Sequence, residues 1–276
     1  MNAKYLRLIK RWILEFLLLF SSLVVVLPLL IVVFGAFKNS AEAMHFNMAL
    51  PNIWHPENFL EVIKKGNVLV AFKNSVIVTA SVIIVVTMAA ALSSYVMARR
   101  NDRLSSAIST YYSLGLIIPW SIVPTVVLMQ ALKLQNTQPG LILVLIAINL
   151  PWSIFLFTNF IRTIPKELDE AAIIDGCSPL QAFLRVIFPL LKPVIATNTI
   201  VVGMGAFNEL QAPLYLLSSN DLTTLPMTVY NFKGRYFSEW NLIFADLVIV
   251  ALPMIILYIV CQKYIVAGIT SGAVKQ

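Results

Sequence analysis

The sequence predicts an all-α membrane protein with six transmembrane helices and with both termini on the cytoplasmic side. Of its 276 residues, 59% are hydrophobic and only 12% are charged, about half the charged fraction of a typical soluble domain. The apolar residues come in long blocks, and the basic residues gather at the ends of these blocks. This arrangement is typical of a polytopic membrane protein and excludes an ordinary soluble domain.

Six stretches are long and apolar enough for a membrane span, which needs about 20 mostly apolar residues. We expect them, with the loops between them, to form a single transmembrane domain over residues 1–276. The third stretch is the least apolar, because serine and threonine side chains dilute its start. The stretches are Trp12–Phe37, Ser75–Met97, Ala107–Leu132, Leu141–Ile161, Val194–Leu217 and Leu242–Cys261.

The distribution of lysine and arginine predicts the orientation of these spans, because loops rich in these residues stay in the cytoplasm. The N-terminal segment, the second and fourth connections and the C-terminal tail hold 13 of the 20 basic residues, against 7 in the other loops. The short connection with Arg99, Arg100 and Arg103 is the strongest local signal. We therefore expect both termini and the fourth connection to be cytoplasmic.

The fourth connection, residues 162–193, is a polar segment between two apolar blocks, and it predicts two short helices joined by a glycine turn. Pro165 suits the first turn of a helix, and the acidic residues that follow favour the positive helix end. Gly176 can adopt the left-handed conformation that ends a helix. Ser178-Pro-Leu-Gln181 resembles a capping box with proline in its first turn, so a second helix should begin there.

One face of the first of these helices is predicted to be apolar. Leu168, Ala171 and Ala172 share that face at helical spacing, while the charged side chains lie largely on the other face. The small alanine side chains allow close approach to another surface. Two readings follow: the face docks into a groove of a soluble partner, or it packs on the protein's own helices.

Polar side chains inside the spans indicate where a solute can pass. Asn208, Glu209 and Gln211 lie in the outer half of the fifth span, and Asn208 and Gln211 can share one side of a helix. They can hydrogen-bond a solute's hydroxyl groups, or they can satisfy one another and neighbouring helices. In the third span, Pro119 and Pro124 predict a break that lines a cavity, because each removes a backbone donor.

No pattern in the sequence is typical of a catalytic centre. A GxxxxGK[ST] phosphate loop is absent, and His45 and His55 have no partners that suggest a metal site. Cys177 and Cys261 have neither a CxxC partner nor a nearby histidine, so we expect no disulfide and no metal. The basic residues form no patch with interleaved aromatic residues, which excludes nucleic-acid binding.

The fourth connection also carries a family resemblance. Glu170-Ala171-Ala172, three residues, Gly176, nine residues and then Val186-Ile187-Phe188-Pro189 resemble the EAA loop of ABC-importer membrane subunits. Val186 and Phe188 conservatively replace the usual isoleucine and leucine. Nearly the whole chain resembles the maltose-type carbohydrate permeases, specifically the shorter six-span member of their heterodimer. Short segments spread along the chain carry this resemblance: Pro56–Phe59, Asn74-Ser75, Ser94–Arg99, Asn136-Thr137, Phe207–Glu209, Pro213-Leu214 and Gly268–Lys275. Phe207 stands where that family often has tryptophan.

The resemblance implies a permease subunit of an ATP-driven importer for sugars, with oligosaccharides as the expected class. It implies that a separate ATPase subunit binds ATP and magnesium, so this chain carries no cofactor of its own. It also implies a longer permease partner, an extracytoplasmic solute-binding protein, and a location in the cell membrane of a prokaryote. The residues implied to contact the ATPase are Glu170, Ala171, Ala172, Asp175 and Gly176. The Gly268–Lys275 tail is implied to reach into the ATPase dimer.

Other functions remain as alternatives at this stage. An importer of glycerol-phosphate or another small polar solute would need cations near its path, for which Lys233 and Arg235 are the candidates. A secondary transporter would show inverted repeats and charges at the midplane of the membrane, and no clear repeat is visible. A membrane-embedded enzyme would need clustered histidines or acids on facing spans. The sequence does not name the solute.

Overall fold

The computed structural model describes residues 3–100, 102–234 and 238–273 of the chain. The predicted all-α fold is present in this part, which contains no β-strand beyond an isolated bridge between Lys233 and Ser238. The contacts divide the chain into two compact units. Unit 1 comprises residues 1–68 and 228–253, and unit 2 comprises residues 69–227 and 254–276.

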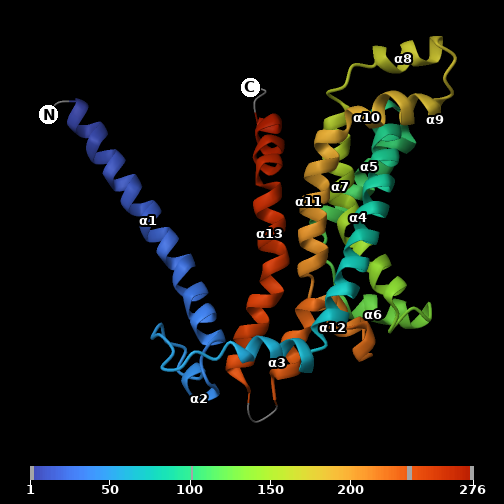
Figure 1. Cartoon of the computed structure of the whole chain (residues 1–276). Helices are drawn as coiled ribbons and strands as arrows, with labels where there is room; N and C mark the ends of the chain where they lie inside the picture. Colours follow the sequence, from blue (N-terminus) through green and yellow to red (C-terminus); the bar gives the residue numbers. More distant parts are fainter. Residues whose placement is uncertain (1–2, 101, 235–237, 274–276) are drawn as a thin grey trace. The chain divides into compact units, whose positions relative to one another are not determined.

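Unit 1 contains the two longest helices of the chain in whole or in part. Its elements are α1 (Ala3–Ala36), α2 (Ser40–Ala43), α3 (Glu57–Lys65), the end of the 3₁₀ segment η3 (Leu225–Phe232) and the first part of α13 (Trp240–Ala273) (Figure 1). In the most apolar stretch of 18 residues in α1, no residue is buried against the rest of the chain. Because leucine and phenylalanine side chains cover this helix on all sides, it needs lipid or another apolar subunit around it.

A buried amide connects three segments of unit 1. Asn58, on α3, donates from Nδ2 to the carbonyl oxygens of Ala36 and Lys38, both at 2.9 Å. Its Oδ1 accepts a hydrogen bond from Nδ2 of Asn241 at 3.0 Å. The last carbonyls of a helix have no partner within the helix, so Asn58 satisfies the end of α1 while tying it to α3 and α13.

Unit 2 contains most of the remaining helices, and its short helices lie at the two ends of its long ones. In Figure 1, α8, α9 and α10 lie at one end of α4, α7 and α11, and α6 and α12 lie toward the opposite end. The bounds are α4 (Val68–Arg99), α5 (Arg103–Ile117), α6 (Ile122–Ala131), α7 (Gln138–Ile161), α8 (Glu167–Ile174), α9 (Pro179–Ala182), the π-helical turn η1 (Phe183–Ile187), α10 (Phe188–Leu190), α11 (Lys192–Asn208), α12 (Gln211–Leu216) and the 3₁₀ turn η2 (Asn220–Leu222).

The core of unit 2 has two apolar clusters, and one of them lies beneath the fourth connection. This cluster includes Phe157 and Ile161 of α7 together with Phe183, Ile187 and Leu191 from the connection itself. The other cluster packs α4, α7, α11 and α12 around side chains such as those of Val82, Leu145, Val202 and Leu216. The helical segments of the connection are therefore held to the spans by a core of their own.

The helices include two sharp bends, and the number of membrane spans depends on how these bends are counted. Four helices are long and apolar enough to cross a membrane, and the number rises to six if each bent pair counts as one span. The pair of α5 and α6 is bent by 119°, and the segment Pro179–Leu190 meets α11 at 75°. The predicted break at Pro119 is confirmed, because this residue lies between α5 and α6. Pro124 instead lies in the first turn of α6, where a missing N–H leaves no helical hydrogen bond unmade.

The expected fifth span, Val194–Leu217, consists of two helices. Glu209 and Leu210 separate α11 from α12. Glu209 has extended backbone angles, and its Oε1 accepts a hydrogen bond from the backbone N–H of Ala212 at 3.0 Å. A carboxylate at this place satisfies a free N–H group of the new helix, so the break comes with its own cap.

A tight turn before α7 generates the first prediction. The Thr137 side chain caps α7 by accepting from the Gly140 N–H at 3.1 Å, and a Cβ on Gly140 would lie 2.1 Å from the Leu134 carbonyl oxygen. Gly140→Ala should therefore lower the free energy of unfolding by about 1–3 kcal/mol, as over-packing does. Thermal unfolding of the purified protein measures the loss.

Gly205→Ala is the matched control for this variant. A Cβ at Gly205 would make only an ordinary contact, 3.7 Å from Oδ1 of Asn149. Since alanine favours a helix over glycine by about 1 kcal/mol, this variant should be as stable as the natural chain or more stable. Equal melting temperatures for the two variants would show that the turn before α7 is not tight.

Candidate functional site

The fourth connection forms the two short helices and the glycine turn that its sequence predicts. The first helix is α8, with three acidic residues in its first turn. Gly176 follows with φ +84°, a left-handed conformation that side chains disfavour. Ser178 and Gln181 then form the predicted capping box, in which Gln181 Oε1 accepts from the Ser178 N–H at 2.9 Å.

The second helix of the connection contains a π-helical turn that the sequence analysis did not predict. In this turn, Phe183–Ile187, the N–H of Phe188 donates to the carbonyl of Phe183, five residues back. Pro189 follows, and its ring cannot donate to the Arg185 carbonyl and would crowd it in a regular α-helix. The wider turn accommodates the proline and points Phe183 and Ile187 into the core. The proline itself was the signal that could have indicated this irregularity.

One side of α8 is open and apolar. Ile173 is 58% exposed and Ile174 is 85% exposed, and Glu170 and Ala171 lie beside them. We call these four residues the α8 surface. Two large aliphatic side chains exposed next to carboxylates, on a segment that joins two spans, are typical of an interaction site. Both isoleucines lie outside the apolar face expected from the sequence, which comprised Leu168, Ala171 and Ala172.

The predicted ATPase-contact residues do not all face the same way. Glu170, Ala171, Asp175 and Gly176 are exposed. Ala172 is only 5% exposed and is turned toward the protein's own core. One face of α8 therefore packs on the chain's own helices and the other is exposed, and docking of the exposed face on a soluble partner stays a prediction.

A second candidate site lies where α5 and α6 bend apart beside α7. It is a cavity of about 730 Å³, which we call the wide cavity. Trp120, at the bend, donates from Nε1 to Oγ1 of Thr125 at 3.0 Å. The lining is mainly apolar and aromatic, and it includes Tyr111, Tyr112, Gly115, Pro119, Trp120 and Pro151.

A smaller cavity of about 150 Å³, the narrow cavity, continues along α5 and α7. Its lining is more polar and includes Ser109, Tyr112, Ser113, Thr158, Asn159 and Arg162. The Thr158 hydroxyl is buried and has no hydrogen-bond partner among the described residues. Tyr112 and Pro151 line both cavities, so the two are adjacent.

The cavities do not include the polar residues predicted for a solute path. Glu209 caps α12, whereas Asn208 and Gln211 are exposed on either side of the helix break. None of the three lines the wide or the narrow cavity. Of the two cations considered for a phosphate, Lys233 is exposed, and Arg235 lies outside the described residues, as does Lys275 of the tail.

The fold matches that of a chain in a solved ABC transporter. The chain superposes with a TM-score of 0.83 on a chain from the crystal structure of a bacterial ABC transporter involved in the import of the acidic polysaccharide alginate. The match covers 96% of this chain and 99% of that chain at 20% sequence identity. Together with its long apolar helices, this fold defines a multi-pass membrane protein.

The sequence comparison then shows the family. Residues 90–271 match the family described as the binding-protein-dependent transport system inner membrane component, and the chain belongs to this family. Its members are permease subunits rather than enzymes, and they work with a second permease, an ATPase and a solute-binding protein.

Several relatives match over almost their whole length. The probable ABC transporter permease protein YurM of Bacillus subtilis is 34% identical over 266 residues, which is 96% of this chain and 87% of that protein. The multiple sugar-binding transport system permease protein MsmG of Streptococcus mutans is 33% identical, over 94% and 95% of the two chains. The diacetylchitobiose uptake system permease protein NgcG of Streptomyces coelicolor is 32% identical, over 94% and 87%.

Proposed function

We propose that this chain is the shorter, six-span permease of a heterodimeric ATP-driven importer for an oligosaccharide. The observation that carries the proposal is the pair of short helices around Gly176, with the exposed isoleucines of the α8 surface. The sugar class is supported by relatives that are named for multiple sugars and for diacetylchitobiose. A glycerol-phosphate importer is not favoured by these relatives.

The proposed orientation places α8 and both termini in the cytoplasm of a prokaryotic cell. The excess of basic residues on that side of the expected spans supports it. The ATPase, which binds ATP and magnesium, then meets the α8 surface, and a solute-binding protein delivers the sugar on the opposite side. In this orientation the C-terminal end of α13 also faces the cytoplasm, where the ATPase would bind.

The α8 surface suits a docking role for a physical reason. Burying Ile173 and Ile174 in a groove removes two aliphatic side chains from water, which contributes about 1.5–3 kcal/mol for each side chain. Glu170 and Asp175 at the edge of the same surface set the orientation through charge. Closure of the ATPase dimer around ATP would then move α8 and switch the permease pair between its outward-open and inward-open states. By linkage, the loaded binding protein favours the same state that ATP favours.

The two adjacent cavities along α5 and α7 are the proposed surface for the sugar. The flat rings of Tyr112 and Trp120 can lie against the apolar C–H faces of a sugar ring in the wide cavity. The hydroxyl and amide groups of Ser113, Thr158 and Asn159 can then exchange hydrogen bonds with sugar hydroxyls in the narrow cavity. Asn208 and Gln211 are second candidates at the α11–α12 break, where Glu209 is already engaged as a cap.

Purification of the complex through a tag on this chain tests the proposal. An ATPase should copurify, and binding proteins loaded from a panel of oligosaccharides should stimulate its ATP hydrolysis in proteoliposomes. One oligosaccharide should accumulate inside the vesicles when ATP is present on the ATPase side. Absence of the ATPase, or stimulation by glycerol-phosphate in place of every sugar, would exclude the proposed function.

The turn at Gly176 gives a second test. Proline requires φ near −65°, so Gly176→Pro cannot keep φ +84° and should separate α8 from α9. We expect uptake to fall to background while the chain still inserts into the membrane. Gly176→Asn is the matched control, because asparagine tolerates the left-handed conformation, and it should retain most of the uptake. Normal uptake by the proline variant would contradict a role for this turn.

A close approach of α5 to α7 at Gly115 gives a third test. A Cβ at Gly115 would lie 2.9 Å from Cγ of Pro151, at the junction of the two cavities. Gly115→Leu should therefore obstruct the path and slow sugar uptake about tenfold, which corresponds to about 1.4 kcal/mol in the barrier to translocation. Ser106→Leu adds a similar side chain to α5 away from both cavities, and it should leave uptake unchanged. Equal uptake by the two variants would place the path elsewhere.

A further inference from the structure

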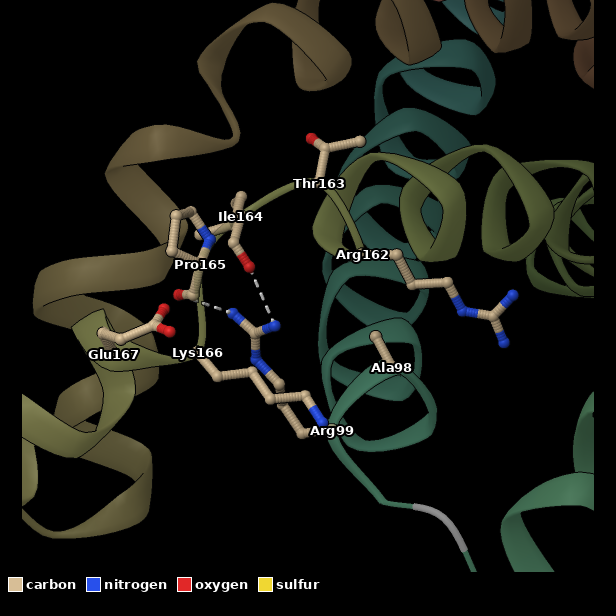
Figure 2. A pocket seen from close by; sticks show the side chains of 8 residues that line it. All are labelled: Ala98, Arg99, Arg162, Thr163, Ile164, Pro165, Lys166 and Glu167. Atoms are coloured by element: carbon tan, nitrogen blue, oxygen red, sulfur yellow. Dashed lines mark hydrogen bonds between the residues drawn. The ribbon is translucent and has the colours of Figure 1, made fainter.

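The cytoplasmic end of α4, as oriented above, holds the connection that leads to α8. Arg99, the last residue of α4, donates from Nη1 to the carbonyl oxygen of Ile164 at 3.0 Å and from Nη2 to that of Pro165 at 3.5 Å. Figure 2 shows the Arg99 guanidinium pointing at these two carbonyls, while the Arg162 side chain points away. A single side chain of α4 therefore fixes the path of the backbone between α7 and α8.

The same guanidinium also holds α8 itself. Nη2 of Arg99 lies 2.8 Å from Oδ2 of Asp169, and Tyr95 donates from its hydroxyl to Oδ1 of the same carboxylate at 2.7 Å. Tyr95 and Arg99 are four residues apart, so they share one face of α4. The Arg99 and Asp169 side chains are only 14% and 12% exposed. We call these three residues the α4–α8 clamp.

The clamp is a polar attachment of a short helix that otherwise packs against its neighbours η1 and α9. The structure gives α8 only 8 residues, too few for a stable isolated helix, and its only buried residues are Asp169 and Ala172. Ala172 offers one methyl group to the core. Asp169 offers a carboxylate that forms an ion pair with the Arg99 guanidinium through Oδ2 and accepts one hydrogen bond, from Tyr95, at Oδ1, and this hydrogen bond defines a direction as well as a contact.

An ion pair is a poor choice at this position if stability is the only requirement. Removing two charges from water costs nearly as much as their attraction returns, and apolar residues of similar size often stabilise more. A carboxylate held by a guanidinium and a hydroxyl differs from apolar packing in that it resists sliding and rotation. The chemistry at Asp169 therefore suits the transfer of motion better than it suits the gain of stability.

Beyond the clamp, α4 is tied to two other spans by buried polar contacts. Ser94 donates from Oγ to the Ile154 carbonyl of α7 at 3.0 Å. Asn198 of α11 donates from Nδ2 to Oγ1 of Thr87 at 3.2 Å. If α8 moves α4, these directional hydrogen bonds pass the movement on to α7 and α11. The helix α7 lines both cavities.

We propose that Asp169, Arg99 and Tyr95 are positioning residues that transmit the movement of α8 to the spans, so that ATP hydrolysis is coupled to sugar import. This inference rests on the proposed function. The α8 surface receives the ATPase, and the opposite face of the same helix passes its motion on through the clamp. Loss of the clamp lets α8 move with the ATPase while the spans stay behind.

The test compares Asp169→Asn with Glu167→Gln in the whole transporter complex in proteoliposomes. Both variants neutralise one acid of α8, but Glu167 is exposed and contributes nothing to the clamp. Three quantities are measured: the amount of ATPase that copurifies, the rate of ATP hydrolysis, and the number of sugar molecules imported per ATP. For Asp169→Asn we expect copurification and hydrolysis to persist while sugar imported per ATP falls at least about fivefold, the lower end of typical coupling effects.

A second variant and a structural readout separate transmission from folding. Tyr95→Phe removes one hydroxyl without changing the shape of the side chain, so it should reduce sugar per ATP in the same direction and by less. Hydrogen exchange of the amides in residues 167–174 should become faster in Asp169→Asn and stay unchanged in Glu167→Gln.

Three results would overturn the inference. Asp169→Asn imports as many sugars per ATP as the natural complex, Glu167→Gln loses as much as Asp169→Asn, or both clamp variants lose the ATPase and their uptake together. A natural complex that imports no sugar and retains no ATPase overturns the proposed function instead. In that case the difference in hydrogen exchange still shows whether Asp169 anchors α8.

Discussion

Every interruption of a helix in this chain has to satisfy its own backbone, because the hydrocarbon interior of a membrane offers no water to unpaired N–H and C=O groups. The structure meets this constraint through side chains at three helix ends. Thr137 caps α7, Glu209 supplies an acceptor for α12, and Asn58 satisfies the end of α1. At each of these three ends a polar side chain supplies a hydrogen-bond partner that the helix itself lacks.

The same constraint relates the surfaces with proposed functions to the places where the helices stop. The bend around Pro119 opens the wide cavity beside α7, and the bend after Leu190 carries the chain from the fourth connection into α11. Regular helices provide the frame, and the irregular segments provide concave or exposed surface. The π-helical turn before Pro189 belongs to the same pattern, since it lets the chain accommodate a proline while the core beneath α8 stays filled.

Polar contacts between helices have a distinct role in such a frame. Lipid and leucine are equally apolar, so apolar contact alone specifies the relative position of two helices weakly, whereas directional hydrogen bonds specify it well. Ser94, Asn198 and Arg99 each reach a neighbouring segment of unit 2. These few contacts define how α4, α7, α8 and α11 are registered, and they make it physically reasonable that the helices move as a set.

The sequence by itself determined the class of fold, the helix–turn–helix of the fourth connection and the break at Pro119, because apolar block length, glycine, proline and capping residues act through local backbone physics. It did not determine which face of α8 is buried: Ala172 points inward, and Ile173 and Ile174 point outward. Nor did it indicate that Asp169 meets Arg99 and Tyr95, or that the polar cavity lies along α5 and α7 rather than at Asn208 and Gln211. These features were decided by the tertiary structure alone, since they depend on contacts between residues far apart in the chain, and no local pattern specifies those contacts.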